Sequence, residues 1–121
     1  MGLTSPMTEL NPSRIAGQIE QVIERLEDLT HSLADLAYQS AIAEASFKSA
    51  YAQARLRHRA ASKEKLTEAL LSDLADDECE EIRLQHLIAS AKHSAARDAL
   101  RATQSQLDGL RTLSAGIRAV S

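Results

Sequence analysis

Apolar residues recur every three or four positions through the first half of the chain. This spacing places them on one face of an α-helix and is the heptad pattern of helices that pack in pairs. It predicts a helix over residues 12–59, which begins with Asn11 as its cap and Pro12 in its first turn. One polar residue, Ser40, interrupts the stripe, which consists of Ile15, Ile19, Val22, Leu26, Leu29, Leu33, Leu36, Ser40, Ala43, Phe47, Ala50 and Ala54.

A second long helix is predicted over residues 77–119. Its apolar stripe is clearest at the end, at Leu100, Thr103, Leu107, Leu110, Ser114 and Ile117, and is blurred before that. Between the two long patterns, residues 60–75 are predicted to form a bend and a short helix with Ser62 as its cap. The acidic run 76–78 fits either a helix break capped by Asp76 or the solvated face of a continuous helix, and the sequence leaves both open.

Two helices of similar length joined by a short corner favour an all-α fold, a long antiparallel helical hairpin of coiled-coil type. A turn near residue 65 places Ile15 near Ile117 and Leu26 near Leu107. We expect residues 12–121 to form one domain and residues 1–11 to form a flexible leader.

A two-helix hairpin buries little apolar surface, so a homo-oligomer or a complex with a partner protein is expected. Several apolar residues also lie off the two stripes, namely Leu10, Ile23, Ala37, Ile42, Leu84 and Leu113. The interface residues predicted from the strongest part of the first stripe are Ile15, Ile19, Val22, Leu26, Leu29, Leu33 and Leu36.

The formal net charge of −3 conceals four blocks of alternating sign. Residues 48–65 carry six Lys/Arg and one Asp/Glu, whereas residues 66–81 carry seven Asp/Glu and no Lys/Arg. The positive charge is densest in residues 55–65, here named the basic corner. Its candidate nucleic-acid contacts are Arg55, Arg57, Arg59, Lys63 and Lys65, with Tyr51 as the one aromatic within reach. The alternative is that the acidic segment folds back and neutralises the basic corner within the chain.

No residue set predicts catalysis, a cofactor, a metal site or a small-molecule substrate. Cys79, His86 and His93 are spaced by seven residues, about 10.5 Å along a helix, which is too far for one metal ion and is typical of a weakly polar stretch of seam. A single cysteine favours a reducing compartment. The opening MGLTSPMTEL lacks the basic and apolar regions of a signal peptide, and no apolar run is long enough for a membrane span, so we expect a soluble, cytoplasmic protein.

Residues 30–120 resemble a known protein family in overall pattern. A long helix with Tyr51-Ala52 and Ala54-Arg55-Leu56-Arg57 leads into Ser62-Lys63-Glu64-Lys65, then an acidic connector and a last helix ending ALRATQSQLDGLRTLSAGIRAV. This organisation resembles small all-helical proteins of phage recombination and replication clusters, including recombination mediators of the UvsY type. The resemblance implies assembly into rings and binding of single-stranded DNA through the basic corner. The secreted WxG hairpin proteins share the length and shape, but this chain has no Trp and no Gly at the bend.

Two functions are therefore expected. The first is a non-enzymatic, oligomeric accessory protein that binds single-stranded nucleic acid in phage-type recombination or replication. The second is a coiled-coil module for protein–protein interaction, an assembly factor or an inhibitor, with no nucleic-acid role.

Overall fold

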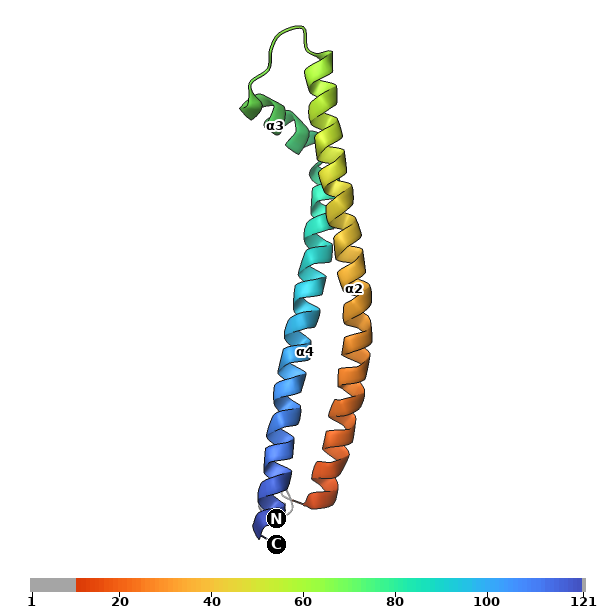
Figure 1. The fold of residues 1–121 in the computed structure, drawn as a ribbon, viewed down its shortest axis with the longest axis vertical. Helices are drawn as coiled ribbons and strands as arrows, with labels where there is room; N and C mark the ends of the chain where they lie inside the picture. The colour runs from red at the N-terminus through yellow and green to blue at the C-terminus, as the bar shows by residue number, and fades with distance from the viewer. Residues whose placement is uncertain (1–10, 121) are drawn as a thin grey trace, which may run out of the picture. The chain divides into compact units, whose positions relative to one another are not determined.

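The computed structural model describes residues 11–120 as three helices, α2 (Pro12–Ala61), α3 (Glu68–Glu78) and α4 (Glu80–Val120), with no strand among them. This confirms the predicted all-α helical hairpin with a short helix between two long ones (Figure 1). The predicted flexible leader, except for Asn11, lies outside the described residues. None of the described helices combines the length and the apolarity that a membrane span needs.

The start of α2 follows the sequence prediction. The side-chain oxygen of Asn11 accepts a hydrogen bond from the Ser13 N–H at 2.9 Å, and Pro12 is the first helical residue. Asn11 thus satisfies one of the backbone donors that a helix leaves free in its first turn, and Pro12 has no such donor to satisfy.

The corner departs from the prediction, since Ser62 does not cap a helix. Its hydroxyl instead closes a local turn, donating to the Glu64 carbonyl at 2.7 Å and accepting from the Glu64 N–H at 3.2 Å. The cap of α3 is Thr67, whose hydroxyl accepts from the Leu70 N–H at 3.1 Å. Asp76 is likewise not a cap, because it lies inside α3, and a single residue, Cys79, separates α3 from α4.

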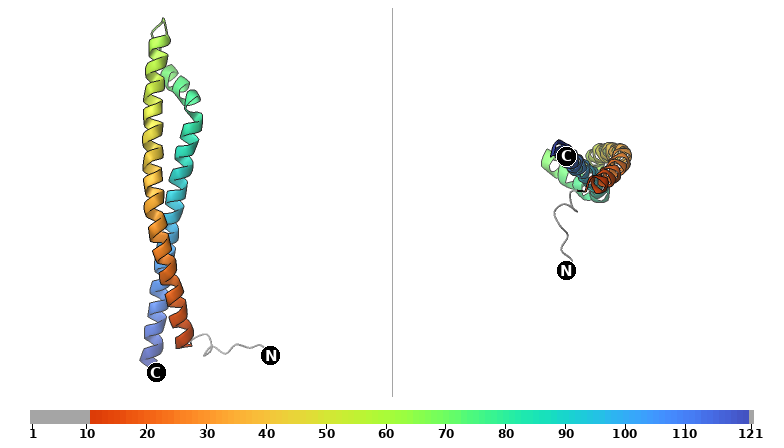
Figure 2. Two further views of the ribbon diagram at one scale, coloured as in Figure 1. Left: turned by 90° about the vertical axis from the view of Figure 1, so that its right-hand side faces the viewer. Right: turned by 90° about the horizontal axis from the view of Figure 1, so that it is seen from below.

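The chain folds into two compact units, and each long helix contributes to both. Unit 1 combines the chain up to Leu33 with the chain from Ala96 onward, and unit 2 is Ala34–Ala95. Within each unit α2 and α4 lie side by side and antiparallel, and in unit 2 α3 packs beside the last turns of α2 (Figures 1 and 2).

The predicted seam of α2 faces α4, since every described member is buried or half-buried. The predicted register is confirmed in unit 1, where Ile15 shares a groove with Ile117 and Leu26 shares another with Leu107. In unit 2, Phe47 stacks on His86 with ring centroids 5.7 Å apart, and Ala54 packs with Cys79. The stripe that looked blurred in the sequence of α4 is a regular seam, also wholly buried or half-buried: Cys79, Ile82, His86, Ala89, His93, Ala96, Leu100, Thr103, Leu107, Leu110, Ser114 and Ile117.

Candidate functional site

Arg55 is the first residue of the basic corner, and its guanidinium group contacts two side chains of α3. The group donates to the Ser72 hydroxyl at 2.7 Å and pairs with the Glu68 carboxylate. It also lies over the Tyr51 ring, 6.0 Å from the ring centroid. Hydrogen bonding by Tyr51 and by Glu68 raises the pKa of Arg55, because these contacts favour the charged form of the guanidinium group.

Arg57 and Arg59 reach two carboxylates at opposite ends of α3. Arg57 donates to Glu78 at 2.7 Å, and Arg59 donates to Glu68 at 3.1 Å. The hydrogen bond from Arg57 lowers the pKa of Glu78. His58 Nε2 lies 3.4 Å from the other Glu78 oxygen, so this carboxylate faces two basic side chains.

These contacts show that the three arginines of the basic corner are paired with the acidic segment of the same chain, which was one of the two alternatives for this charge block. The side chains of Arg57 and Arg59 nevertheless remain more than half exposed, at 59% and 57%. Exposed pairs of this kind contribute little to stability and can exchange partners. They orient α3 on α2 without removing the arginines from contact with solvent.

Lys63 and Lys65 differ from the arginines because they lie in the connector between α2 and α3. Both are exposed, and among residues 11–120 neither forms an ion pair. Together with Arg59 they line a shallow groove, which also contains the carboxylates of Glu64 and Glu68. The connector is therefore a mixed-charge surface with two free ammonium groups.

The seam between α2 and α4 holds Cys79, His86 and His93, whose spacing of seven residues is too wide for one metal ion within a helix. Cys79 is a free, buried thiol packed with Ala54 and Ala75, and His86 stacks on Phe47 with its Nδ1 lacking a hydrogen-bond partner. His93 is half-buried further along the same face of α4. Within the described residues no group of three ligand side chains is close enough to hold a metal ion. These three side chains fill the seam between α2 and α4.

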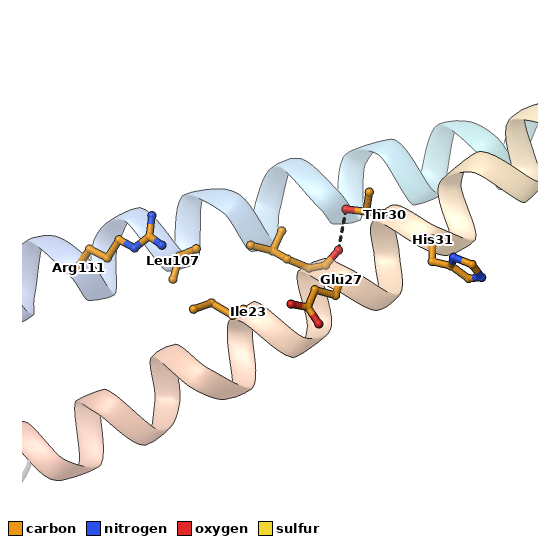
Figure 3. Close-up of a pocket in the computed structure, with 7 residues that line it drawn as sticks. Ile23, Glu27, Thr30, His31, Leu107 and Arg111 are labelled. Atoms are coloured by element: carbon orange, nitrogen blue, oxygen red, sulfur yellow. Dashed lines mark hydrogen bonds between the residues drawn. The ribbon is translucent and has the colours of Figure 1, made fainter.

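A groove in unit 1 runs between α2 and α4 (Figure 3). Ile23 and Leu107 face each other across it, whereas the His31 ring points away from α4 (Figure 3). Glu27 and Arg111 both line the groove, but no ion pair joins the two helices in the described part of unit 1. The groove is an apolar furrow with polar edges.

The predicted interface residues lie in the seam itself. Ile15 and Val22 are buried, and Ile19, Leu26, Leu29, Leu33 and Leu36 are half-buried, all on the side of α2 that meets α4. Their role toward other chains stays a prediction.

Large apolar side chains are instead exposed on the outer surface of unit 2. The exposed fractions are 67% for Tyr38, 48% for Ile42, 56% for Leu84, 55% for Leu87 and 46% for Ile88. The sequence pattern placed Ile42 and Leu84 off the stripes but did not single out the other three. The signal that finds Tyr38 and Ile88 is a second heptad spacing, Tyr38–Ile42 and Leu84–Ile88–Ala91, on the side of each helix opposite its seam, whereas Leu87 lies outside this spacing.

Comparison with known proteins finds no matching family model, no matching curated protein and no matching solved structure.

Proposed function

We propose that this chain is a non-enzymatic, cytoplasmic helical interaction module, which binds helices of other protein chains, copies of itself included, on the outer surface of unit 2. The observation that carries the proposal is that five large apolar side chains are exposed there, two on α2 and three on α4. Exposed apolar clusters on small proteins are typical of protein interaction sites.

The proposal is tested by placing a photo-crosslinking amino acid at Ile88 of the full chain and irradiating both the purified protein and cells that contain it. Adducts are expected from this position. The control position is Ala102, which occupies the same heptad position of α4 in unit 1 and is exposed there. Absence of adducts from Ile88, or equal adducts from both positions, would contradict the proposal.

Binding of single-stranded nucleic acid in phage-type recombination or replication is a second candidate, favoured by the two lysines of the connector, which have no carboxylate partner within residues 11–120. Phosphate contacts release counterions, so binding should weaken steeply between about 50 and 200 mM salt. The arginine pairs with Glu68 and Glu78 oppose this function, because phosphates would have to compete with carboxylates.

Fluorescence anisotropy with a labelled single-stranded oligonucleotide tests this second candidate. Replacing Lys63 and Lys65 by Gln should lower the affinity and reduce the salt slope by about 1 for each phosphate that the variant no longer binds. Arg101→Gln, an exposed cation in α4, is the matched control and should leave binding unchanged. Binding that is absent, or insensitive to salt, excludes this candidate.

A further inference from the structure

Four exposed large apolar residues of unit 2 belong to two stripes at heptad spacing, one on each long helix. Leu56, Leu70 and Leu87 are also exposed and are not members of these stripes. The outer stripe of α2 is Tyr38, Ile42, Ala45, Ser49 and Ala52, and the outer stripe of α4 is Leu84, Ile88, Ala91 and Ala95. Successive residues of a helix are about 100° apart, so Tyr38, midway between the seam residues Leu36 and Ser40, leaves α2 on the side opposite the seam. Tyr38 and Ile42 also line one edge of a groove that contains Ile82 and Gln85 of α4, but about half or more of each residue stays exposed.

Resting on the proposed function, we propose that the outer stripe of α2 in one copy of the chain packs antiparallel against the outer stripe of α4 in a second copy. The partner on this surface is thereby a further copy of the same chain, and the two contact faces are different.

The same heptad positions in unit 1 provide an internal comparison. There the outward residues of α2 are polar or charged, namely Arg14, Gln21, Glu24, Asp28 and His31, apart from Gly17. Those of α4 are charged, small or polar, namely Asp98, Ala102, Ser105, Gly109, Thr112 and Gly116. Large apolar side chains occupy the outward positions only within unit 2, as expected if another chain packs on that unit alone.

Side-chain sizes in the two stripes complement one another. The contacts Phe47–His86 and Ala54–Cys79 define the register of unit 2: α2 and the chain from Cys79 into α4 are antiparallel, and the two residues of each pair lie at the same height along the hairpin. If a second copy lies beside the first without an axial shift, residues of α2 in one copy lie at the same height as the residues of α4 that they match within a single hairpin. Large Tyr38 and Ile42 then face small Ala95 and Ala91, and small Ala45 and Ser49 face large Ile88 and Leu84. Alternation of large and small residues across facing positions is how helices interlock.

Charges beside the stripes also complement one another. On one flank the levels of Lys48 on α2 and Glu80 on α4 of the second copy differ by about five residues, or ~7.5 Å along the axis, a gap that two long side chains can span. Within residues 11–120 Glu80 has no ion-pair partner, and Lys48 holds only an exposed pair with Glu44 at 2.8 Å. On the other flank Ser46 comes within a turn of the level of Gln85, and no like charges meet on either flank.

An interface between two different faces leaves one stripe free at each end of a dimer. Each free stripe can bind another copy, so association continues beyond two copies. This is a property that a symmetric contact of one stripe with itself does not have.

Two variants test the proposal, Ile42→Asp, which blocks the stripe of α2, and Ile88→Asp, which blocks that of α4. Both positions are about half exposed, so the hairpin should stay folded, which circular dichroism checks. Sedimentation velocity should show the wild-type chain in species larger than a dimer and each variant alone as a monomer. An equimolar mixture should form a dimer and nothing larger, because only one pair of intact stripes remains. Val120→Asp, at an 88% exposed residue, adds the same charge elsewhere and should behave as wild type.

Other outcomes overturn the proposal. A monomeric wild-type chain excludes a second copy as the partner, and crosslinks from Ile88 to a different protein would then leave the proposed interaction function standing. One variant that assembles as wild type shows a contact of one stripe with itself. A mixture that stays monomeric excludes the pairing of the α2 stripe with the α4 stripe.

Discussion

Ala54 illustrates at the residue scale how small side chains bring the elements of unit 2 together. It is fully buried and packs with Ala75 of α3 and with Cys79 at the joint between α3 and α4, with Phe47 and Tyr51 beside them. A methyl side chain at this point lets α2 approach the joint closely. Interiors packed to this density do not accept extra atoms without shifts of the backbone.

Replacing Ala54 by Leu is therefore expected to destabilise the protein by about 1–3 kcal/mol, because the added atoms have no space between α2 and α3. Urea unfolding followed by circular dichroism measures the change. Ala60→Leu, at an exposed position of the same helix, should leave stability nearly unchanged. An equal loss in both variants would mean that Ala54 is not a close-packing point.

At the scale of elements, α3 shows how helix starts are selected. Ser62 and Thr67 both carry a capping hydroxyl, but Lys63-Glu64-Lys65 follows the first and Glu68 follows the second. Because the first turn of a helix favours negative charge, the site followed by Glu68 is the better start. The sequence already contained this signal in the two lysines, which are unfavourable after a cap.

Thr67→Ala should lower the stability of α3 by about 1 kcal/mol, the usual cost of removing an N-cap. Amide hydrogen exchange over residues 68–78 measures this as faster exchange. Ser62→Ala removes a hydroxyl that does not cap and should leave exchange in α3 unchanged. If the two variants exchange alike, the cap does not hold the start of α3.

The contact between Arg57 and Glu78 makes the docking of α3 sensitive to acid. Since the pKa of Glu78 is lowered in the folded protein, its contribution to stability is present above the ordinary glutamate pKa of about 4.3 and is lost as the pH falls through the lowered value. The buried thiol of Cys79 reports docking, because it lies between α2 and the end of α3. Its reaction with dithiodipyridine, a reagent active in acid, should speed up as the pH falls in this range.

Glu78→Gln should remove part of that pH dependence. Glu64→Gln should not, because Glu64 is an exposed acid that forms no ion pair with the part of the chain that the structure describes. An unchanged profile in Glu78→Gln would show that the acid sensitivity lies elsewhere.

The sequence predicted those parts of the fold that depend on a local repeat. The heptad spacing of Ile15 to Ala54 located the seam of α2, and the charge blocks located the turn. The seam of α4 was less visible, because Cys79, His86 and His93 occupy apolar positions. Their spacing of seven indicated a weakly polar stretch of seam, and packing of His86 on Phe47 and of Cys79 with Ala54 confirms it for these two. Which acids pair with the arginines depends on the path of α3, a property of tertiary structure that spacing does not encode.

For the whole molecule, the small core limits how much stability a single chain can have. The only large side chains among the described residues with less than 2% of their surface exposed are Ile15 and Leu71, and most seam positions are half-buried. Small domains with little buried surface commonly gain stability by associating. Association and folding should then be linked, because copies that bind only the folded chain stabilise it by mass action.

Thermal unfolding should reveal this linkage. The melting temperature of the wild-type chain is expected to rise with protein concentration, since each copy acts as a ligand of the folded state of another. Ile42→Asp and Ile88→Asp should each melt at a temperature that does not depend on concentration, and their equimolar mixture should regain part of the dependence. Val120→Asp should follow the wild type. A wild-type melting temperature independent of concentration, or a dependence that survives in both stripe variants, would show that the outer stripes do not stabilise the fold. The hairpin would then owe its stability to its own seam alone, in spite of the two stripes that unit 2 leaves exposed.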